Sequence, residues 1–409
     1  MTHTSTFIAI DLDKQARTKS RIQSIDLLRG VVMIIMAIDH IRDYFHYEAF
    51  FFSPTDISQT TTAIFFTRWI THLCAPTFIF LAGVSVYFIR QQKSQRQTAT
   101  FLLTRGFWLI VLQFTVIRFA WSFDPLFHYN AHAIISDIGL CMMLLAALIY
   151  LPWNAILIIS LMMIVGHNLL DGVSFASGSV ASVIWSLLHV NTNYDFGNGY
   201  SFEIFYPIIP WIGVMALGYC VGRLFDNEYS SDYRKKFLLR TGIVSLVFLL
   251  LLRYINVYGD PAPWSTQTEW SKTVLSFLNF QKYPPSLFYA GVMLGISFIL
   301  LGLMEGKNLD RWKPVILFGK VALFYYVMHI LVIHIFAMIT VVMSGLPWQT
   351  MIFSGPIKAG SLLLKGKFGF SIGYVYLVWL VVILFLYPLC VYWNDFKTRN
   401  KNKWWVSYV

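Results

Sequence analysis

Residues 371–393 read SIGYVYLVWLVVILFLYPLCVYW, a run without a single charged side chain. A helix rises about 1.5 Å per residue, so this run is long enough to cross the roughly 30 Å hydrocarbon core of a bilayer. The whole chain is similar, because 57% of its 409 residues are hydrophobic and only 12% are charged. Soluble domains carry about 25% charged residues. We therefore expect an integral membrane protein.

Nine further stretches have the length and hydrophobicity of a spanning helix. Together with 371–393 they predict an all-α, polytopic helix bundle of about ten transmembrane helices. The ten stretches lie near 25–47, 62–89, 101–121, 132–151, 153–171, 203–225, 237–256, 284–304, 315–341 and 371–393. The shorter run 176–190 is rich in small residues, and we expect it to form a re-entrant or interfacial helix.

The positive residues predict how the chain lies in the membrane. The formal net charge is +11, which by itself would suit a nucleic-acid partner. Twenty of the 31 Lys and Arg residues, however, fall in alternate connections between the stretches, beginning with Lys14, Arg17, Lys19 and Arg21. By the positive-inside rule these connections are cytoplasmic. We therefore predict two cytoplasmic termini and no nucleic-acid partner, with a basic segment 1–24, a transmembrane domain 25–393 and a basic tail 394–409.

The cysteines give no sign of a disulfide framework or a metal site. All four lie inside apolar stretches and lack metal-ligand spacing. They are Cys74, Cys141, Cys220 and Cys390. We expect free thiols and no metal.

The first stretch, 25–47, carries an unusual number of ionisable side chains. Each costs roughly 2.5 to 3.5 kcal/mol inside a membrane on insertion scales, so each needs a partner or a function. Asp26 and Arg29 are three residues apart and can form a structural ion pair, and Arg29 is also a candidate for substrate binding. At the other end, Asp39 and Asp43 share a face with His40 nearby. An imidazole beside carboxylates has the parts for general base catalysis.

The second stretch offers a matching pair. RWITHLC places Arg68 and His72 four residues apart on one face, at the level of Asp39 and His40. We expect the two helices to share a site, although a lone histidine at such a position is as often a core residue. Asp39, His40, Asp43 and His72 are therefore candidate catalytic residues, and Arg68 is a candidate for substrate binding.

Three later stretches combine helix breakers with polar residues at membrane depth and suggest a lined cavity. They read YPIIPWIGVMALGY at 206–219, KYPPSLFYAGVMLG at 282–295 and FGKVALFYYVMHI at 318–330. Lys282, Tyr283 and His329 in these stretches, with Asp137, are further candidates for substrate binding. Proline caps and glycine packing would explain the breakers alone but leave His329 unexplained.

These phrases, with RIQSIDLLRG and THLCAPTFIFLAGVS, resemble the bacterial branch of the heparan-α-glucosaminide N-acetyltransferase catalytic-domain family over nearly the whole chain. The residues that match its two opening motifs are Ser24, Asp26, Arg29 and Gly30, then Pro76, Phe78, Phe80 and Gly83. The resemblance implies a membrane-bound acyltransferase that passes acetyl from cytoplasmic acetyl-CoA to a sugar or glycan amine or hydroxyl at the outer side. It also implies a location in the bacterial cytoplasmic (inner) membrane. A homo-oligomer is compatible with the sequence.

The chain departs from the family in two places. His72 stands where the lysosomal members have an acidic residue, and their outer-loop active-site histidine has no counterpart, since His46 is out of register. We therefore expect direct transfer with His40 as the base, oriented by Asp39 or Asp43.

The remaining roles follow from charge. Arg68 or His72 would stabilise the tetrahedral oxyanion, and Arg29, Arg90 and Arg105 would attract the CoA phosphates. The alternative interpretation is a proton-coupled transporter or lipid-linked sugar flippase, in which the same Asp and His residues would relay protons.

Overall fold

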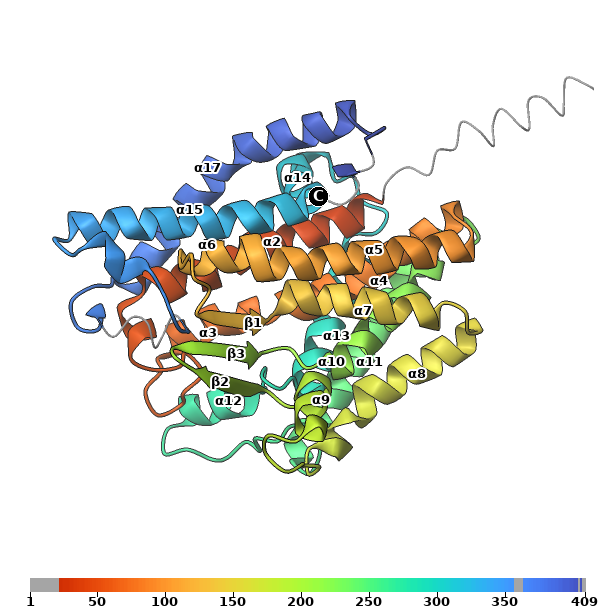
Figure 1. Cartoon of the computed structure of the whole chain (residues 1–409). Coiled ribbons are helices and arrows are strands. Elements are labelled where there is room, and N and C mark those ends of the chain that lie inside the picture. The colour runs from red at the N-terminus through yellow and green to blue at the C-terminus, as the bar shows by residue number, and fades with distance from the viewer. Residues whose placement is uncertain (1–21, 357–362, 404, 407–409) are drawn as a thin grey trace, which may run out of the picture.

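The computed structural model describes residues 22–356, 363–403 and 405–406, so Lys14, Arg17, Lys19 and Arg21 lie outside the described residues. Long helices from all parts of the chain run roughly side by side (Figure 1). The long helices are α2 (Gln23–Phe45), α4 (Cys74–Gln92), α5 (Gln95–Leu112), α7 (Ile134–Leu148), α8 (Trp153–Gly166), α10 (Ile208–Val221), α11 (Ser231–Ile255), α13 (Leu287–Met304), α15 (Ala322–Met343) and α17 (Ile372–Arg399). The short helices are α3 (Thr62–Thr71), α6 (Arg118–Ser122), α9 (Val180–Leu188), α12 (Trp270–Leu278) and α14 (Lys313–Lys320).

Each of the ten predicted stretches holds all or most of at least one of these helices. In the part of the chain that the structure describes, eight helical segments are long and apolar enough to cross a membrane. The two predicted spans not among them are α2, which carries five charged side chains, and α7, which has only 15 residues. The structure therefore confirms the all-α polytopic bundle.

Two predicted spans are interrupted. The stretch 62–89 breaks at His72 and Leu73, between α3 and α4, and Pro76, which has no N–H, lies in the first turn of α4. The stretch 315–341 breaks at Val321, between α14 and α15. The first break falls at a candidate catalytic residue, His72.

Close glycine contacts fix the position of α2 and α4. A Cβ added to Gly319 of α14 would lie 2.0 Å from the carbonyl oxygen of Asp26 in α2. In the same way, a Cβ on Gly218 of α10 would lie 2.0 Å from the carbonyl oxygen of Phe80 in α4. Small residues of this kind allow backbones to approach closely, which is how membrane helices associate without a hydrophobic drive between them.

A small sheet was not predicted. It contains β1 (Tyr129–His132), β2 (Thr192–Gly197) and β3 (Tyr200–Ile204) in the order β1-β3-β2, with β1 parallel and β2 antiparallel to β3. Tyr129 lies opposite Ser201. Because β3 takes up 200–204, the span predicted at 203–225 begins only at Ile208. The run 192–204 alternates polar and apolar residues around a GNG turn, a hairpin signal outweighed by the neighbouring apolar runs.

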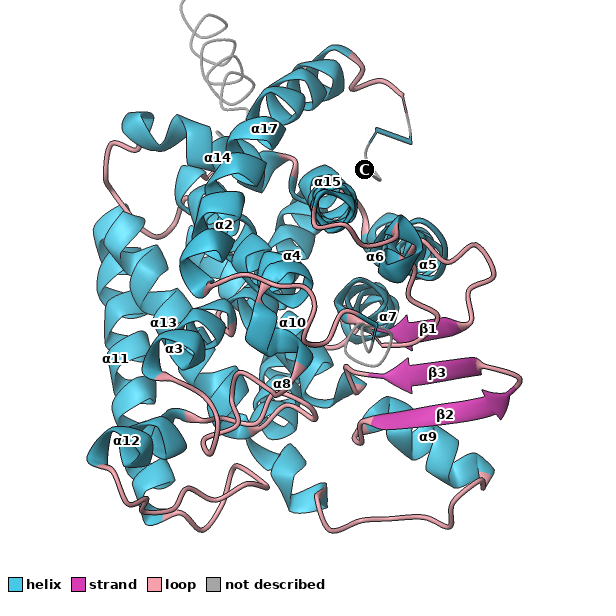
Figure 2. Cartoon of the chain, turned by 90° about the vertical axis from the view of Figure 1, so that its left-hand side faces the viewer, coloured by secondary structure: helices cyan, strands magenta, loops and turns pink. Residues whose placement is uncertain are grey.

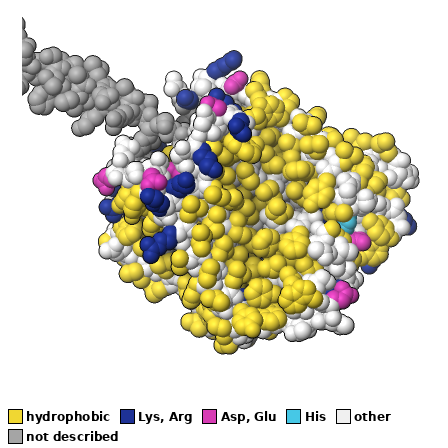
Figure 3. Space-filling view, turned by 180° about the vertical axis from the view of Figure 1, so that it is seen from behind, with side chains coloured by type: hydrophobic (Ala, Val, Ile, Leu, Met, Phe, Trp, Pro, Cys, Tyr) yellow, Lys and Arg dark blue, Asp and Glu magenta, His cyan; other side chains and the backbone are white. Residues whose placement is uncertain are grey.

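The two ends of the bundle differ in character. One, the basic end, carries the connections 90–96, 223–236 and 305–313. The other, the sheet end, carries the sheet with α9 and α12 (Figure 2). Figure 3 shows hydrophobic side chains over much of one face, with Lys and Arg gathered at one edge. The predicted segment 176–190 contains α9, whose nine residues are too few to cross a bilayer.

Candidate active site

The sheet-end half of α2 meets α3 through charged side chains. An oxygen of Asp39 forms an ion pair with Arg68 of α3, and its other oxygen lies 3.0 Å from Nη2 of Arg42. The same Nη2 lies 2.6 Å from Asp43. The two helices therefore meet through these side chains, and their sharing of one site stays a prediction. Arg42, which the sequence argument did not single out, joins both carboxylates because it follows Asp39 by three residues.

His40 of α2 is paired with His329 of α15. Nδ1 of His40 lies 2.7 Å from Nε2 of His329, whose own Nδ1 lies 3.0 Å from the carbonyl oxygen of Tyr325. A carbonyl only accepts, so Nδ1 of His329 carries the proton and its Nε2 accepts from Nδ1 of His40. This pattern assigns the proton-free nitrogen of neutral His40 to Nε2. The structure thus gives His40 a partner, and that partner is His329 in place of the predicted Asp39 or Asp43.

The segment before α13 brings Lys282 and Tyr283 to this cluster. Lys282 lies close enough to Asp39 and His40 for its charge to act on both. Its ammonium group also stacks over the ring of Tyr283 at 5.2 Å. The hydroxyl of Tyr283 lies 3.4 Å from that of Tyr206, which precedes α10. Together with His329, which contacts His40, these residues bring all three predicted stretches together beside α2 and α3.

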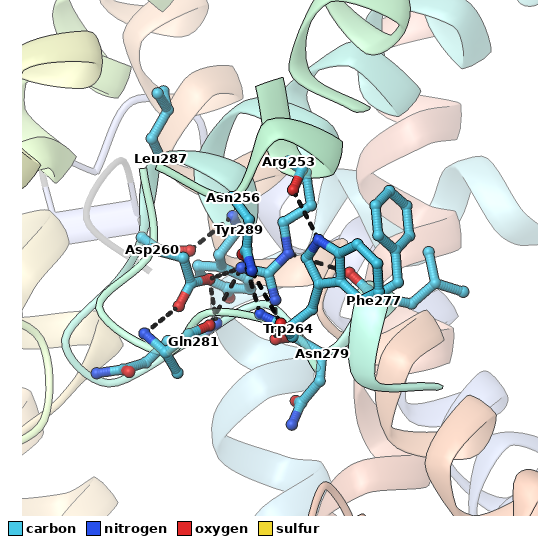
Figure 4. Close-up of polar contacts among 12 residues, drawn as sticks. Arg253, Asn256, Asp260, Trp264, Phe277, Asn279, Gln281, Leu287 and Tyr289 are labelled. Carbon is cyan, nitrogen blue, oxygen red and sulfur yellow. Dashed lines mark hydrogen bonds and ion pairs between the residues drawn. The ribbon is translucent and has the colours of Figure 1, made fainter. Parts of the chain in front are cut away.

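A buried arginine holds this segment in place (Figure 4). Arg253, in the last turn of α11, donates to the carbonyl oxygens of Phe277 at 3.2 Å and Asn279 at 3.3 Å, at the end of α12. It thereby satisfies carbonyls that the end of a helix leaves unpaired. Asp260 lies 3.7 Å from Arg253 and accepts from the backbone N–H of Gln281 at 3.0 Å. We call Arg253, Asp260 and the backbone groups to which they are hydrogen-bonded the arginine network.

Ionisation of Asp260 has a cost in this loop. Burial raises the pKa of Asp260 above its ordinary value, while the N–H groups of Gln281 and Ala262 and the charge of Arg253 act in the opposite direction. The raised value means that burial outweighs those three contributions.

His72 lies at the break between α3 and α4 and is only 1% exposed. Neither of its ring nitrogens has a hydrogen-bond partner among the described residues. Its ring packs edge-on against Tyr289 of α13 at 5.2 Å. The charges of Arg68 and Lys282 act on it, so it belongs to the same cluster.

Two predicted site residues lie elsewhere. Arg29 is ten residues before Asp39, or about 15 Å along α2, and contacts Asp26 at 3.2 Å and Ser85 at 2.9 Å. The predicted Asp26–Arg29 ion pair is thus confirmed. Asp137 of α7 is fully buried and lies 3.7 Å from His132, and no contact between it and the Asp39 cluster is present in the described residues.

An open depression of about 520 Å³ lies at the basic end. It is lined by Arg90, Gln91, Gln92, Lys93 and Tyr219. Nearby, Phe101 is flanked by Lys93 at 4.8 Å and by Arg105 at 5.9 Å. Positive charge and an aromatic ring therefore surround this depression.

The described residues hold no group of three or more His, Cys, Asp or Glu side chains that could bind a metal ion. The four cysteines are free and buried, as predicted for free thiols.

Sequence reasoning missed several aromatic residues of the site, although it named the stretches that contain them. Tyr206 and Trp211 lie in the 206–219 phrase, and Tyr289 lies in the 282–295 phrase. The signal was an aromatic residue next to a proline or one helical turn after it. Trp121, which packs on His40 at 4.8 Å, lay in a run that carried no such signal.

Comparison with known proteins adds one match. A family model described as heparan-alpha-glucosaminide N-acetyltransferase, catalytic, matches residues 21–253, which is more than half of the 409-residue chain. The matched region includes α2, α3 and α4 and ends before Lys282 and His329. No curated protein was found to match the chain.

Proposed function

The chain belongs to the heparan-alpha-glucosaminide N-acetyltransferase catalytic family, and from this premise we propose that it moves an acetyl group from acetyl-CoA to an acceptor sugar across the membrane. Family membership and the eight apolar helices found among the described residues make it a transmembrane acetyltransferase. The donor, the acceptor and the direction of transfer are our proposals, argued below.

The proposed donor site is at the basic end, which we assign to the cytoplasm by the positive-inside rule. Arg90 and Lys93 line the depression of about 520 Å³ there, and Arg105 lies beside it. Guanidinium groups bind phosphates through charge-assisted hydrogen bonds, so this region suits the phosphates of CoA. Arg29, deeper in the bundle, would then face the part of the donor that enters the membrane.

The observation that carries the proposal is the His40–His329 pair. Because Nδ1–H of His40 donates a hydrogen bond to Nε2 of His329, Nε2 of His40 is the nitrogen that can take a proton from an amine or hydroxyl. His329 also stabilises the cation that forms, a role that the sequence argument gave to Asp39 or Asp43. Those two acids instead neutralise Arg68 and Arg42.

The transfer step runs as follows. The acceptor nitrogen or oxygen loses its proton to Nε2 of His40 and bonds to the thioester carbonyl carbon. His72 and Lys282 stabilise the negative oxygen of the tetrahedral species. The carbon–sulfur bond then breaks, and the CoA thiolate takes the proton from His40. The products are an acetylated sugar and free CoA.

The other predicted residues take supporting places in this proposal. Tyr283 and Arg68 lie beside the cluster and would bind the hydroxyl groups of the acceptor sugar. Asp137, buried with His132, would contact the acceptor only if α7 forms part of its path. We further propose that the protein resides in a bacterial inner membrane.

The test is release of free CoA from acetyl-CoA by protein purified in detergent, with a panel of amino sugars as acceptors. We expect acceptor-dependent release, and a loss of about 10²- to 10⁴-fold in His40→Ala. The matched control is His128→Ala, because His128 lies in a loop at the sheet end and pairs with Asp124 at 2.9 Å. That control should retain activity.

Two outcomes would overturn the proposal. Full activity in His40→Ala would remove His40 from the mechanism. Absence of CoA release, together with absence of stabilisation by acetyl-CoA, would instead favour the transporter or flippase, which needs no acyl donor.

A further inference from the structure

Three buried side chains meet where α3, α10 and α13 come together, and their polar atoms have no partners. They are His72, Trp211 and Tyr289, which are exposed to only 1%, 0% and 0%. Both ring nitrogens of His72, Nε1 of Trp211 and the hydroxyl of Tyr289 make no hydrogen bond among the described residues. We call these three side chains the aromatic chamber.

The three rings are in contact. Tyr289 lies in the middle, with His72 edge-on at 5.2 Å and Trp211 edge-on at 5.9 Å. Tyr206 packs on Trp211 at 5.8 Å and on Tyr283 at 5.4 Å, which links the chamber to the candidate active site. The charges of Asp39 and Arg68 act on Tyr289.

Unpartnered polar atoms at this burial are rare in folded proteins, since most buried donors are bonded. The fold would be more stable with phenylalanine at Trp211 and Tyr289, because a buried donor without a partner is destabilising. Four such atoms in one place therefore indicate a ligand that is not part of the chain.

The chemistry of the chamber defines that ligand. An indole N–H is a donor only, and the tyrosine hydroxyl and the neutral imidazole can also donate. The chamber contains no charged side chain of its own, and its walls are aromatic rings. It therefore suits an uncharged oxygen acceptor attached to a small apolar group, which describes a carbonyl with its methyl.

We propose that His72, Trp211 and Tyr289 form the acyl pocket, in which their N–H and O–H groups donate to the carbonyl oxygen of an acetyl group. The identity of the ligand rests on the proposed function. The acetyl group has two sources with the same chemistry, the thioester of acetyl-CoA and the acetamide of the acetylated product.

The test removes one donor at a time and keeps each ring. We expect Trp211→Phe and Tyr289→Phe to raise the melting temperature of the ligand-free protein by about 2 °C each, because each deletes an unpartnered polar atom. Each should also weaken the preference for acetyl-CoA over free CoA, measured by titrated thermal shift, by about tenfold.

Trp393→Phe is the matched control. Nε1 of Trp393 is also buried without a partner, but its ring stacks on Phe324 at 4.8 Å, and both residues lie at the basic-end portions of α17 and α15. It should raise the melting temperature in the same way and leave the preference for acetyl-CoA unchanged.

The outcomes separate this proposal from the proposed function. If wild type prefers acetyl-CoA and both chamber variants keep that preference, or if both melt well below wild type, the acyl pocket is overturned and the acyltransferase stands. If wild type shows no preference for acetyl-CoA and no CoA release, the proposed function fails. The same thermal-shift assay with N-acetylglucosamine and with glucosamine tests the second source. A preference for N-acetylglucosamine that the chamber variants lose would show that the pocket holds the acetamide of the product.

Discussion

The arginine network and the aromatic chamber are both buried polar regions on either side of the start of α13, yet they differ in how their atoms are paired. Arg253, 1% exposed, donates to four backbone carbonyls and faces a carboxylate. His72, equally buried, has no partner for either ring nitrogen. A network whose groups are all paired stabilises the fold, whereas several unpaired groups gathered at the same depth point to a ligand.

The aromatic chamber also depends on the arginine network for the position of Tyr289. Asp260 holds the backbone of Gln281, and the side-chain amide of Gln281 donates to the carbonyl oxygen of Tyr283 at 3.3 Å. Ser286 caps α13 by accepting from the N–H of Tyr289 at 3.1 Å. The paired region therefore positions the segment from which the unpaired region takes Tyr289.

The largest effect is expected from Arg253→Met. It leaves the carboxylate of Asp260 without its charge partner and the carbonyls of Ser276 and Phe277 in α12 without their hydrogen bonds from the guanidinium group. Breaking a buried pair in this way costs about 3 to 5 kcal/mol. We expect a large fall in melting temperature and in the yield of folded protein. Arg240→Met is the control, because Arg240 lies exposed on the same helix. Equal stability of the two variants would contradict the role given to the network.

His72→Phe should change stability in the opposite direction. It removes two unpartnered nitrogens and keeps a flat ring, so we expect the ligand-free protein to gain about 1 to 3 kcal/mol. Acetyl transfer should fall by about 10²-fold, because an oxyanion donor is lost. Melting curves and CoA release measured on one preparation check both parts. A loss of stability in His72→Phe would contradict the statement that the nitrogens of His72 are unpaired in the ligand-free protein.

Asp260→Asn should have a smaller effect than Arg253→Met. Asp260 accepts from the N–H groups of Ala262 at 2.9 Å and Gln281 at 3.0 Å with different oxygens, and an amide can accept only one of the two. We expect a loss of about 1 to 2 kcal/mol. KM for the acceptor should rise more than kcat falls, because the Lys282–Tyr283 segment loosens while His40 stays in place. An unchanged KM would show that Asp260 only stabilises the fold.

The smallest effect is a pH dependence that comes from Asp260. Its pKa is raised in the folded protein by burial, so the native state holds this proton to higher pH than the unfolded chain, whose pKa is about 3.9. Stability from this group is therefore present at low pH and is lost as pH rises through the raised pKa. The melting-temperature advantage of wild type over Asp260→Asn should shrink over that interval. A difference that grows with pH would reverse the sign assigned here.

The sequence predicted the spans well and the site in part. Long apolar runs can only be helices in a membrane, which is why all ten stretches contain helices. Helical periodicity predicted the Asp26–Arg29 pair correctly, because residues three and four apart share a face. It also placed Asp39 and Arg68 on faces at the same level, and the structure joins them in an ion pair. Contacts between distant segments leave no such signal. The pairing of His40 with His329 joins residues 289 positions apart, and the contact of Trp211 with Tyr289 joins two separate helices.

Helix α2 packs against α3, α4, α13, α14, α15 and α17. Its carboxylate Asp39 finds Arg68 only 29 residues later, and His40 finds His329 after 289 residues. An unpaired charge is costly in lipid, but each carboxylate of α2 also has an arginine of the same helix within reach. The His40–His329 pair is different, because its two halves stand 289 residues apart, so it can form only once α15 has joined the bundle.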